Sequence, residues 1–142
     1  MERLIVPFRR WHYEWLIADK SSEGSPVRLN DRVLERVEQC NSWTGVVDGE
    51  PIAVAGTMEQ WPGRHMAWAY LADSTASHMT WVTLATRRKL RDVKGRLELT
   101  VREDFAAGHR WARLLGFEVE SPCLKRYGPR GENHVGYSRF NE

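Results

Sequence analysis

The sequence predicts an α+β protein in which helices pack on a central β-sheet, and three patterns support this prediction. Hydrophobic and polar residues alternate through Leu97–Val101, which is the period of a strand with one buried face. From Asp104 the hydrophobic residues recur at helical spacing until Gly116, which suits the left-handed cap at a helix end. Earlier, Asp48-Gly49 separates two hydrophobic runs and favours a tight hairpin turn, because this pair accepts positive φ angles.

The composition indicates one ordinary globular domain, 1–142, which is large enough to bury a core without disulfides. Seven tryptophans predict an aromatic-rich core, and a net charge of +2 is too small to make nucleic acid or a membrane surface the default partner. Cys40 and Cys123 stand alone, so we expect reduced thiols and no metal site. Met1–Arg10 holds no apolar run long enough for a signal peptide or a membrane span, so we expect a cytoplasmic protein.

The N-terminal part predicts one short strand and two helices. Leu4–Phe8 is a hydrophobic run whose proline confines a strand to a sheet edge or ends it. Helical spacing follows in Trp11–Ala18, and the turn residues of Ser21–Pro26 break it. Asn30 or Asp31 then caps an amphipathic helix. Two helices are therefore expected before the main sheet.

The middle of the chain predicts a three-stranded meander and a helix. Trp43–Val47 and Ile52–Thr57 form the hairpin, and a turn at Trp61–Arg64 leads into a third strand at Met66–Tyr70. Ser77–Asp92 is long enough for a helix, and its basic C-terminal part is typical of a solvated helix end.

The C-terminal part predicts a last hairpin, in which Cys123–Tyr127 pairs with His134–Phe140 across Gly128–Gly131. Before it, Phe117, Val119 and Leu124 continue the chain as extended structure after Gly116. Together with the strand and helix that precede them, these segments give the order helices, meander, helix, strand, helix, hairpin.

This order, and the strand, short helix and Leu-Gly-Phe sequence within it, resembles the GNAT acetyltransferase family. The matching residues are Leu97, Leu99, Val101, Leu115, Gly116 and Phe117. The resemblance implies a three-layer GNAT-like fold, with a mixed, mostly antiparallel central sheet flanked by helices. It also implies acetyl-CoA as the acetyl donor if the chain is an enzyme.

One departure from the GNAT pattern lies in the turn that binds the cofactor. GNAT enzymes hold the pyrophosphate of acetyl-CoA on a glycine-rich turn between the fourth strand and the next helix, where glycine lets the main chain approach the ligand. The corresponding segment here, Leu71–Met79, has no glycine, and Asp73 suits a helix cap better than a phosphate site. The remaining candidates for cofactor binding are Ala72, Ser74, Thr75 and Ser77.

A second departure lies in the short helix, where the family usually has an Asn at the start and a Tyr that protonates the departing thiolate. These positions fall on Phe105 and Ala112, and neither side chain can give a proton. Other candidates are needed for catalysis. They are Tyr127 and Tyr137 as acids and Glu59 and His109 as bases, each of which also has a purely structural interpretation.

Two hypotheses of different class follow. The glycine-free turn and the two replaced positions favour a non-catalytic protein on the GNAT scaffold, with no cofactor expected. Its layout is similar to small proteins of tailed bacteriophages, both acetyltransferase-like and internal virion proteins. This implies virion or assembly proteins as partners, and a location in the host cytoplasm and then in the virion.

The alternative is an acetyl-CoA-dependent N-acetyltransferase with a divergent cofactor site, which the element order favours. We prefer the non-catalytic hypothesis at this stage, because function depends on the site and not on the fold. A groove between the fourth and fifth strands that side chains fill would support the scaffold, and an open groove would support the enzyme.

Overall fold

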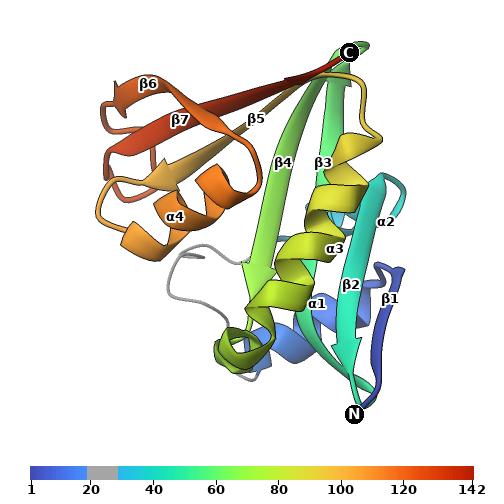
Figure 1. Ribbon diagram of the computed structural model, residues 1–142. Helices are drawn as coiled ribbons and strands as arrows, with labels where there is room; N and C mark the ends of the chain where they lie inside the picture. Colours follow the sequence, from blue (N-terminus) through green and yellow to red (C-terminus); the bar gives the residue numbers. More distant parts are fainter. Residues whose placement is uncertain (19–28) are drawn as a thin grey trace.

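A seven-stranded sheet forms the centre of the computed structural model, which describes residues 1–18 and 29–142 (Figure 1). The strands are β1 (Arg3–Pro7), β2 (Asn41–Val47), β3 (Glu50–Trp61), β4 (Arg64–Leu71), β5 (Gly95–Arg102), β6 (Glu118–Leu124) and β7 (His134–Asn141). The helices are α1 (Arg10–Ala18), α2 (Asp31–Glu38), α3 (Met79–Arg91) and α4 (Ala106–Leu114), and a 3₁₀-helix, η1 (Asp73–His78), leads directly into α3.

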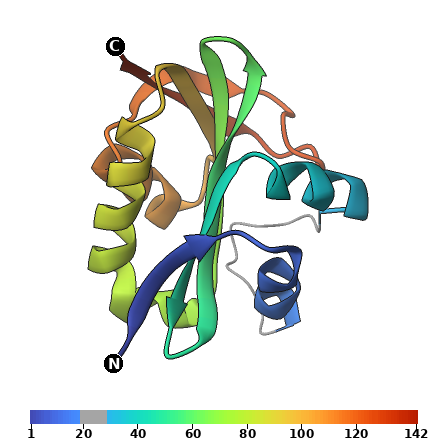
Figure 2. The same cartoon turned by 90° about the vertical axis from the view of Figure 1, so that its right-hand side faces the viewer.

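The helices cover both faces of the sheet, which confirms the predicted α+β class. Figure 2 shows α1 and α2 on one face and α3 and α4 on the other. The first face buries a core that includes Leu16, Leu34 and Val54. The second face buries Leu97 and Phe117 among other residues. No helix in the described ranges combines the length and the apolar composition that a membrane span requires.

The strand order is β1-β2-β3-β4-β5-β7-β6, and each neighbouring pair is antiparallel except β4 and β5. These two strands run parallel and pair only at Arg64↔Arg96, His65↔Leu97 and Met66↔Glu98. Beyond that point they separate into a V, with β3 beside one arm and β7 beside the other (Figure 1). The sheet is therefore continuous only through the apex of this V.

Several local predictions are confirmed. Asp48 and Gly49 have φ angles of 48° and 83°, as the hairpin turn requires. The side chain of Asn30 caps α2 by accepting a hydrogen bond from the Val33 N–H. Gly116 follows α4 with a φ of 90°, and β1 lies at the sheet edge.

Two boundaries differ from the predictions. The helix predicted at Ser77–Asp92 is preceded by η1, so helical structure begins already at Asp73. The extended structure predicted after Gly116 is confirmed as β6, but the last hairpin was predicted from Cys123–Tyr127, whereas β6 already pairs with β7 from Glu118 onward. The predicted loop Ser21–Pro26 lies outside the described residues.

Charged side chains hold the apex of the V together. Glu98 of β5 accepts hydrogen bonds from the Nε of Arg64 on β4 at 3.0 Å and from the Nε of Arg96 at 2.6 Å. Arg96 also donates to Glu120 of β6 through its Nη1 at 2.9 Å. The Arg64 guanidinium, followed by Arg96, holds the pKa of Glu98 below its ordinary value of 4.5. The carboxylate of Glu98 is therefore the link between the two strands where they part.

Glu98→Gln should lower the free energy of unfolding, because it removes a carboxylate that lies between two guanidinium groups. A carboxyl whose folded-state pKa is lowered contributes stability that is present above its unfolded pKa and is lost as the pH falls through the folded one. The variant should therefore lose less stability than the parent between about pH 6 and pH 3. Urea titrations across this range measure the effect. Glu35→Gln, at an exposed position on α2, is the matched control. If the free energy of unfolding fell equally with pH in the parent and both variants, the role of Glu98 would be contradicted.

Candidate functional site

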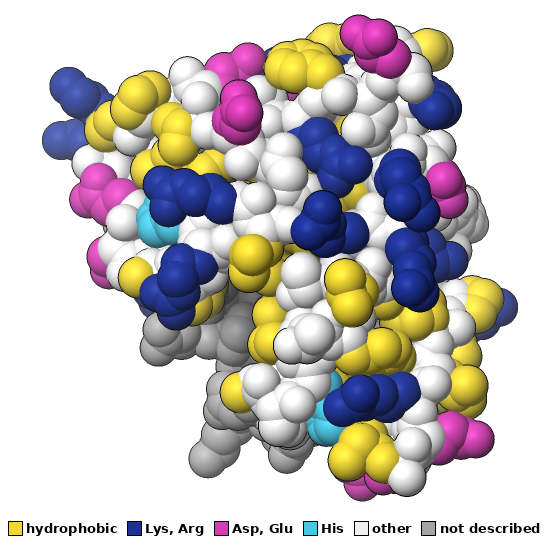
Figure 3. Space-filling view, in the orientation of Figure 1, with side chains coloured by type: hydrophobic (Ala, Val, Ile, Leu, Met, Phe, Trp, Pro, Cys, Tyr) yellow, Lys and Arg dark blue, Asp and Glu magenta, His cyan; other side chains and the backbone are white. Residues whose placement is uncertain are grey.

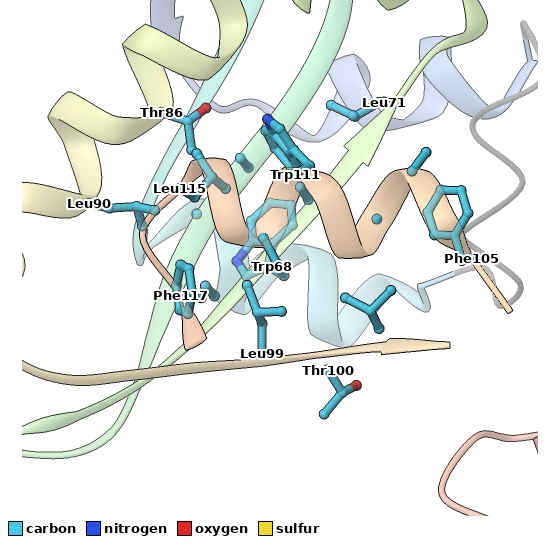
Figure 4. A pocket seen from close by; sticks show the side chains of 18 of the residues that line it. Trp68, Leu71, Thr86, Leu90, Leu99, Thr100, Phe105, Trp111, Leu115 and Phe117 are labelled. Carbon is cyan, nitrogen blue, oxygen red and sulfur yellow. The ribbon is translucent and has the colours of Figure 1, made fainter. Parts of the chain in front are cut away.

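The separation of β4 from β5 opens a mostly apolar cavity of about 310 Å³. Both strands line it, together with α3 and α4 (Figure 4). In the view of Figure 4, Leu90 and Phe117 lie at one end and Phe105 at the other, with Leu99 and Trp111 between them. Small residues leave the space open, namely Ala67 and Ala69 of β4 and Gly108 and Ala112 of α4.

The cavity also explains why Leu99 is only half-buried, although its period predicts an inward position. Leu97 and Val101 on the same face of β5 are buried, with exposed fractions of 0% and 9%. The side chain of Leu99 points to the same side but faces the cavity. The groove between the fourth and fifth strands is therefore open and not filled.

The two arms of the V present main-chain groups to the cavity. The pairing of β4 with β5 stops at Met66 and Glu98, so Ala67–Leu71 and Leu99–Arg102 have edges with no ladder partner in the opposite strand. Main-chain N–H and C=O groups away from water need hydrogen-bond partners. An extended ligand that contains amide groups can supply them by lying between the arms, as an added strand does.

One side of the cavity is fixed by a contact between two helices. The Nε1 of Trp111 on α4 donates a hydrogen bond to the Oγ1 of Thr83 on α3 at 2.9 Å. Because α3 follows β4 and α4 follows β5, this bond ties the elements that follow the two arms of the V.

The four candidates for cofactor binding lie together in η1 or at its start, but the described contacts of three of them are with the protein itself. Ala72 is buried, and its N–H donates to the Ile52 carbonyl oxygen at 2.9 Å. Thr75 is 1% exposed, and its hydroxyl donates to the same oxygen at 2.7 Å. The hydroxyl of Ser77 lies 3.5 Å from the Ser74 carbonyl oxygen, while Ser74 is exposed.

Two of the catalytic candidates, His109 and Tyr137, form one hydrogen-bonded pair. The Nδ1 of His109 lies 2.7 Å from the Tyr137 hydroxyl, and its Nε2 lies 3.0 Å from the Glu103 carbonyl oxygen. Tyr137 is 1% exposed and belongs to the core between the sheet and α4. Both ring nitrogens of His109 therefore have partners, and neither residue lines the cavity.

The other two catalytic candidates lie apart from this pair. Glu59 is exposed near the turn between β3 and β4, opposite His65 and at the closed end of the V. Tyr127 is 52% exposed after β6, with its ring centroid 5.4 Å from that of His134. The four candidates do not form one cluster.

Sequence reasoning did not identify His134, at the start of β7, as a site residue. Among the described lining residues, only His134 and Arg102 carry ionisable side chains. Arg102 donates from its Nε to Asp104 at 2.5 Å, and its guanidinium lies over the Phe105 ring. His134 belongs to no motif, and only the pairing of β7 with β5 brings it to the cavity.

The ring of His134 has one bonded and one unbonded nitrogen. Its Nδ1 lies 3.0 Å from the Oγ1 of Thr100. Its Nε2 is buried and has no hydrogen-bond partner among the described residues, with Glu132 at 3.9 Å. A buried nitrogen without a partner is uncommon and marks a candidate functional atom.

Phe105 and Ala112, which stand where the family usually has Asn and Tyr, both line the cavity. Ala112 is 2% exposed on the inner face of α4, so this face offers no proton donor at that position. In the described part of the chain, no three metal-ligating side chains come together, and Cys40 and Cys123 are unbridged.

Several solved structures are similar over nearly the whole chain. Ard1 from Thermoplasma volcanium has a TM-score of 0.78 at 12% identity and covers 100% of this chain and 99% of its own. A GNAT-family acetyltransferase from Streptococcus pneumoniae has a TM-score of 0.73 at 12% identity, and the match covers 99% of this chain and 100% of that protein. The ribosomal-protein-alanine N-acetyltransferase from Brucella melitensis has a TM-score of 0.70 at 17% identity, and the match covers 96% of this chain and 99% of that protein.

No protein-family model and no curated protein matches the sequence. The similar structures give no support to a bacteriophage subgroup, a virion protein or a structural protein. Sequence identities of this size show the fold alone. The fold of the neighbours agrees with the strand order, the V between β4 and β5 and the flanking helices of this chain. The chain has the GNAT fold.

Proposed function

We propose that the chain is a GNAT-type N-acetyltransferase, which takes the acetyl group of acetyl-CoA in the β4–β5 cavity and passes it to an amine. The open cavity carries this proposal. Protein cores are normally close-packed, so a mostly apolar space of about 310 Å³ between two strands has the character of a ligand site. The names of the neighbours, a GNAT-family acetyltransferase and a ribosomal-protein-alanine N-acetyltransferase, support the same function.

The cavity fits the acyl and pantetheine parts of acetyl-CoA. The unpaired edges of Ala67–Leu71 and Leu99–Arg102 would hold the amide groups of the pantetheine arm, and the apolar lining would hold its methylene groups. When bound, acetyl-CoA would supply a thioester carbonyl for an amine to attack; the C–S bond would break as the amide forms, and CoA would leave as its thiolate. The turn at η1 offers a pyrophosphate less, because it holds no glycine, and the Thr75 N–H and hydroxyl donate to carbonyl oxygens of the protein.

His134 is the residue that we propose as the acceptor of the amine proton. An amine attacks only in its neutral form, so a base near the cavity speeds the reaction, and histidine can act as a base near neutral pH. Thr100 orients the ring through Nδ1, which leaves Nε2 as the nitrogen that takes the proton. The apolar lining keeps water away from the reacting groups.

Acetyl-CoA at a saturating concentration should raise the melting temperature, because a ligand stabilises the state that it binds. At 100 times its dissociation constant it adds about 2.7 kcal/mol, or about 5–11 °C for a domain near this size. Ala69→Leu puts a larger side chain into the cavity and should abolish this shift while the free protein still melts cooperatively. Differential scanning fluorimetry measures both effects.

Ala106→Leu, at an exposed position on α4 that does not line the cavity, is the matched control and should keep the shift. A parent protein that shows no shift with millimolar acetyl-CoA would contradict the enzyme proposal. The non-catalytic hypothesis, which the glycine-free turn favours, would then explain the molecule better.

His134→Gln should lower the rate of acetyl transfer by about 10²–10⁴-fold, since it removes the general base. A peptide with an N-terminal alanine is the first acceptor to use, because the Brucella melitensis neighbour is named for that residue. His109→Gln should change the rate little, and the opposite order of the two variants would assign the base to His109.

A further inference from the structure

We propose that a polar recess beside the C-terminal ends of α3 and α4 is a binding site for a terminal phosphate group, separate from the β4–β5 cavity and independent of the acetyltransferase proposal. The recess has a volume of about 480 Å³. Two arginines from distant parts of the chain line it, Arg87 of α3 and Arg139 of β7. The sequence alone favoured a solvated end for α3, and only the fold brings Arg139 beside that end.

The Arg139 side chain is held in place by both helix ends. Its Nη1 donates to the Leu115 carbonyl oxygen at the end of α4 at 2.7 Å, and its Nε donates to the Oδ1 of Asn141 at 3.0 Å. The side-chain amide of Asn141 donates in turn to the carbonyl oxygens of Leu90 and Val93, at 2.8 and 2.7 Å, where α3 ends. Among the described residues the Nη2 of Arg139 has no hydrogen-bond partner, so it can donate to a ligand.

Three guanidinium groups gather at the recess without an acidic partner. Arg91 lies one turn after Arg87 on the same side of α3. Burial lowers the pKa of Arg139 below its ordinary value, and the positive charges of Arg87 and Arg91 lower it further. Glu118 also lines the recess, but in the part of the chain that the structure describes it forms no ion pair with any of the three. The protein therefore concentrates positive charge here and leaves it without a carboxylate.

The basic surface extends from the recess over the outer side of α3. Its exposed arginines on this helix are Arg87, Arg88 and Arg91. Figure 3, in the orientation of Figure 1, shows Lys and Arg side chains gathered over the upper part of α3. Exposed charges act over about 8 Å at physiological ionic strength. Several like charges together therefore attract an anion toward the recess.

A terminal phosphate group fits this arrangement better than a carboxylate does. Guanidinium groups donate paired hydrogen bonds to phosphate oxygens. A terminal phosphate presents three acceptor oxygens in different directions and carries about two negative charges, so it can contact arginines from α3 and from β7 at once. A carboxylate has two acceptor oxygens in one plane and a single charge. The ligand class that the recess favours is therefore a phosphate monoester.

The recess lies away from the groups that surround the β4–β5 cavity. Among the described lining residues, the two spaces share only Leu115. At about 1.5 Å of rise per residue, Arg87 lies roughly 12 Å along the axis of α3 from Met79, where the helix begins, and Arg91 lies roughly 18 Å from it. A phosphate in the recess and a ligand in the cavity can therefore bind at the same time.

Inorganic phosphate is the first probe, titrated at constant ionic strength into the full chain and followed in proton–nitrogen NMR spectra. The side-chain Nε–H signals of Arg87 and Arg139 and the main-chain amide signal of Gly116 should shift and saturate. Arg87→Gln combined with Arg91→Gln should weaken binding at least about tenfold, because each hydrogen bond to a charged group contributes about that much. No saturable shift at millimolar phosphate would overturn the proposal.

Arg32→Gln combined with Arg36→Gln is the matched control, because it removes two exposed arginines at the same spacing from α2, on the other face of the sheet. This control pair should leave the affinity for phosphate unchanged. An equal loss of affinity in both pairs would show a general attraction for anions and would contradict a built site.

Two further ligands test the chemical class and the separation from the cavity. Glycerol phosphate should displace inorganic phosphate, whereas a single-stranded oligonucleotide without a terminal phosphate should not, and equal displacement by both would overturn the assignment to a monoester. Acetyl-CoA itself carries a phosphate monoester, so its affinity is measured with the same variants. That affinity should stay unchanged, and a tenfold loss confined to the Arg87 and Arg91 pair would contradict the separation of the two sites.

Discussion

The ion pairs of Glu98 with Arg64 and Arg96 fix the point at which β5 leaves β4. Up to Met66 and Glu98 the two strands pair and the sheet is continuous. After these residues each arm of the V has one antiparallel neighbour, β3 beside β4 and β7 beside β5. The arms stay apart because small residues of β4 and α4 face the gap while α3 and α4 are tied through Trp111 and Thr83. A cavity lined by unpaired strand edges is the result.

The cavity and the adjacent turn point to different conclusions about function when each is considered alone. An open apolar cavity with two unpaired edges is suited to an extended acyl-pantetheine ligand. A turn without glycine, Lys or Arg offers less to a pyrophosphate. The preference for a non-catalytic scaffold depended on the turn and the replaced positions, and the open groove shifts it toward an enzyme.

The sequence predicted the fold because its signals are local. Asp48-Gly49, the Asn30 cap and Gly116 each act within a few residues, and the alternation of Leu97–Val101 marks a strand without knowledge of its partners. The 3₁₀ start of α3 was missed, since Thr75 takes that position through a bond to Ile52, far away in the chain. Extended structure after Gly116 was predicted, but the partner of β7 was placed too late in the chain, because the pairing of β6 with β7 cannot be read from local signals.

The candidate site was predicted less well, because it depends on contacts between distant strands. Ala112 and Phe105 could be assigned to the helix beside the cavity, since they lie at fixed distances from Leu115-Gly116-Phe117. His134 could not, because its role follows from a cross-strand contact with Thr100 and an unpaired ring nitrogen. Amide hydrogen exchange by NMR, with and without acetyl-CoA, tests the central claim that the V is the ligand site. Amide groups of Ala67–Leu71 and Leu99–Arg102 that face the gap should exchange at least about tenfold more slowly with the ligand. Unchanged exchange at both edges under saturating acetyl-CoA would contradict the account.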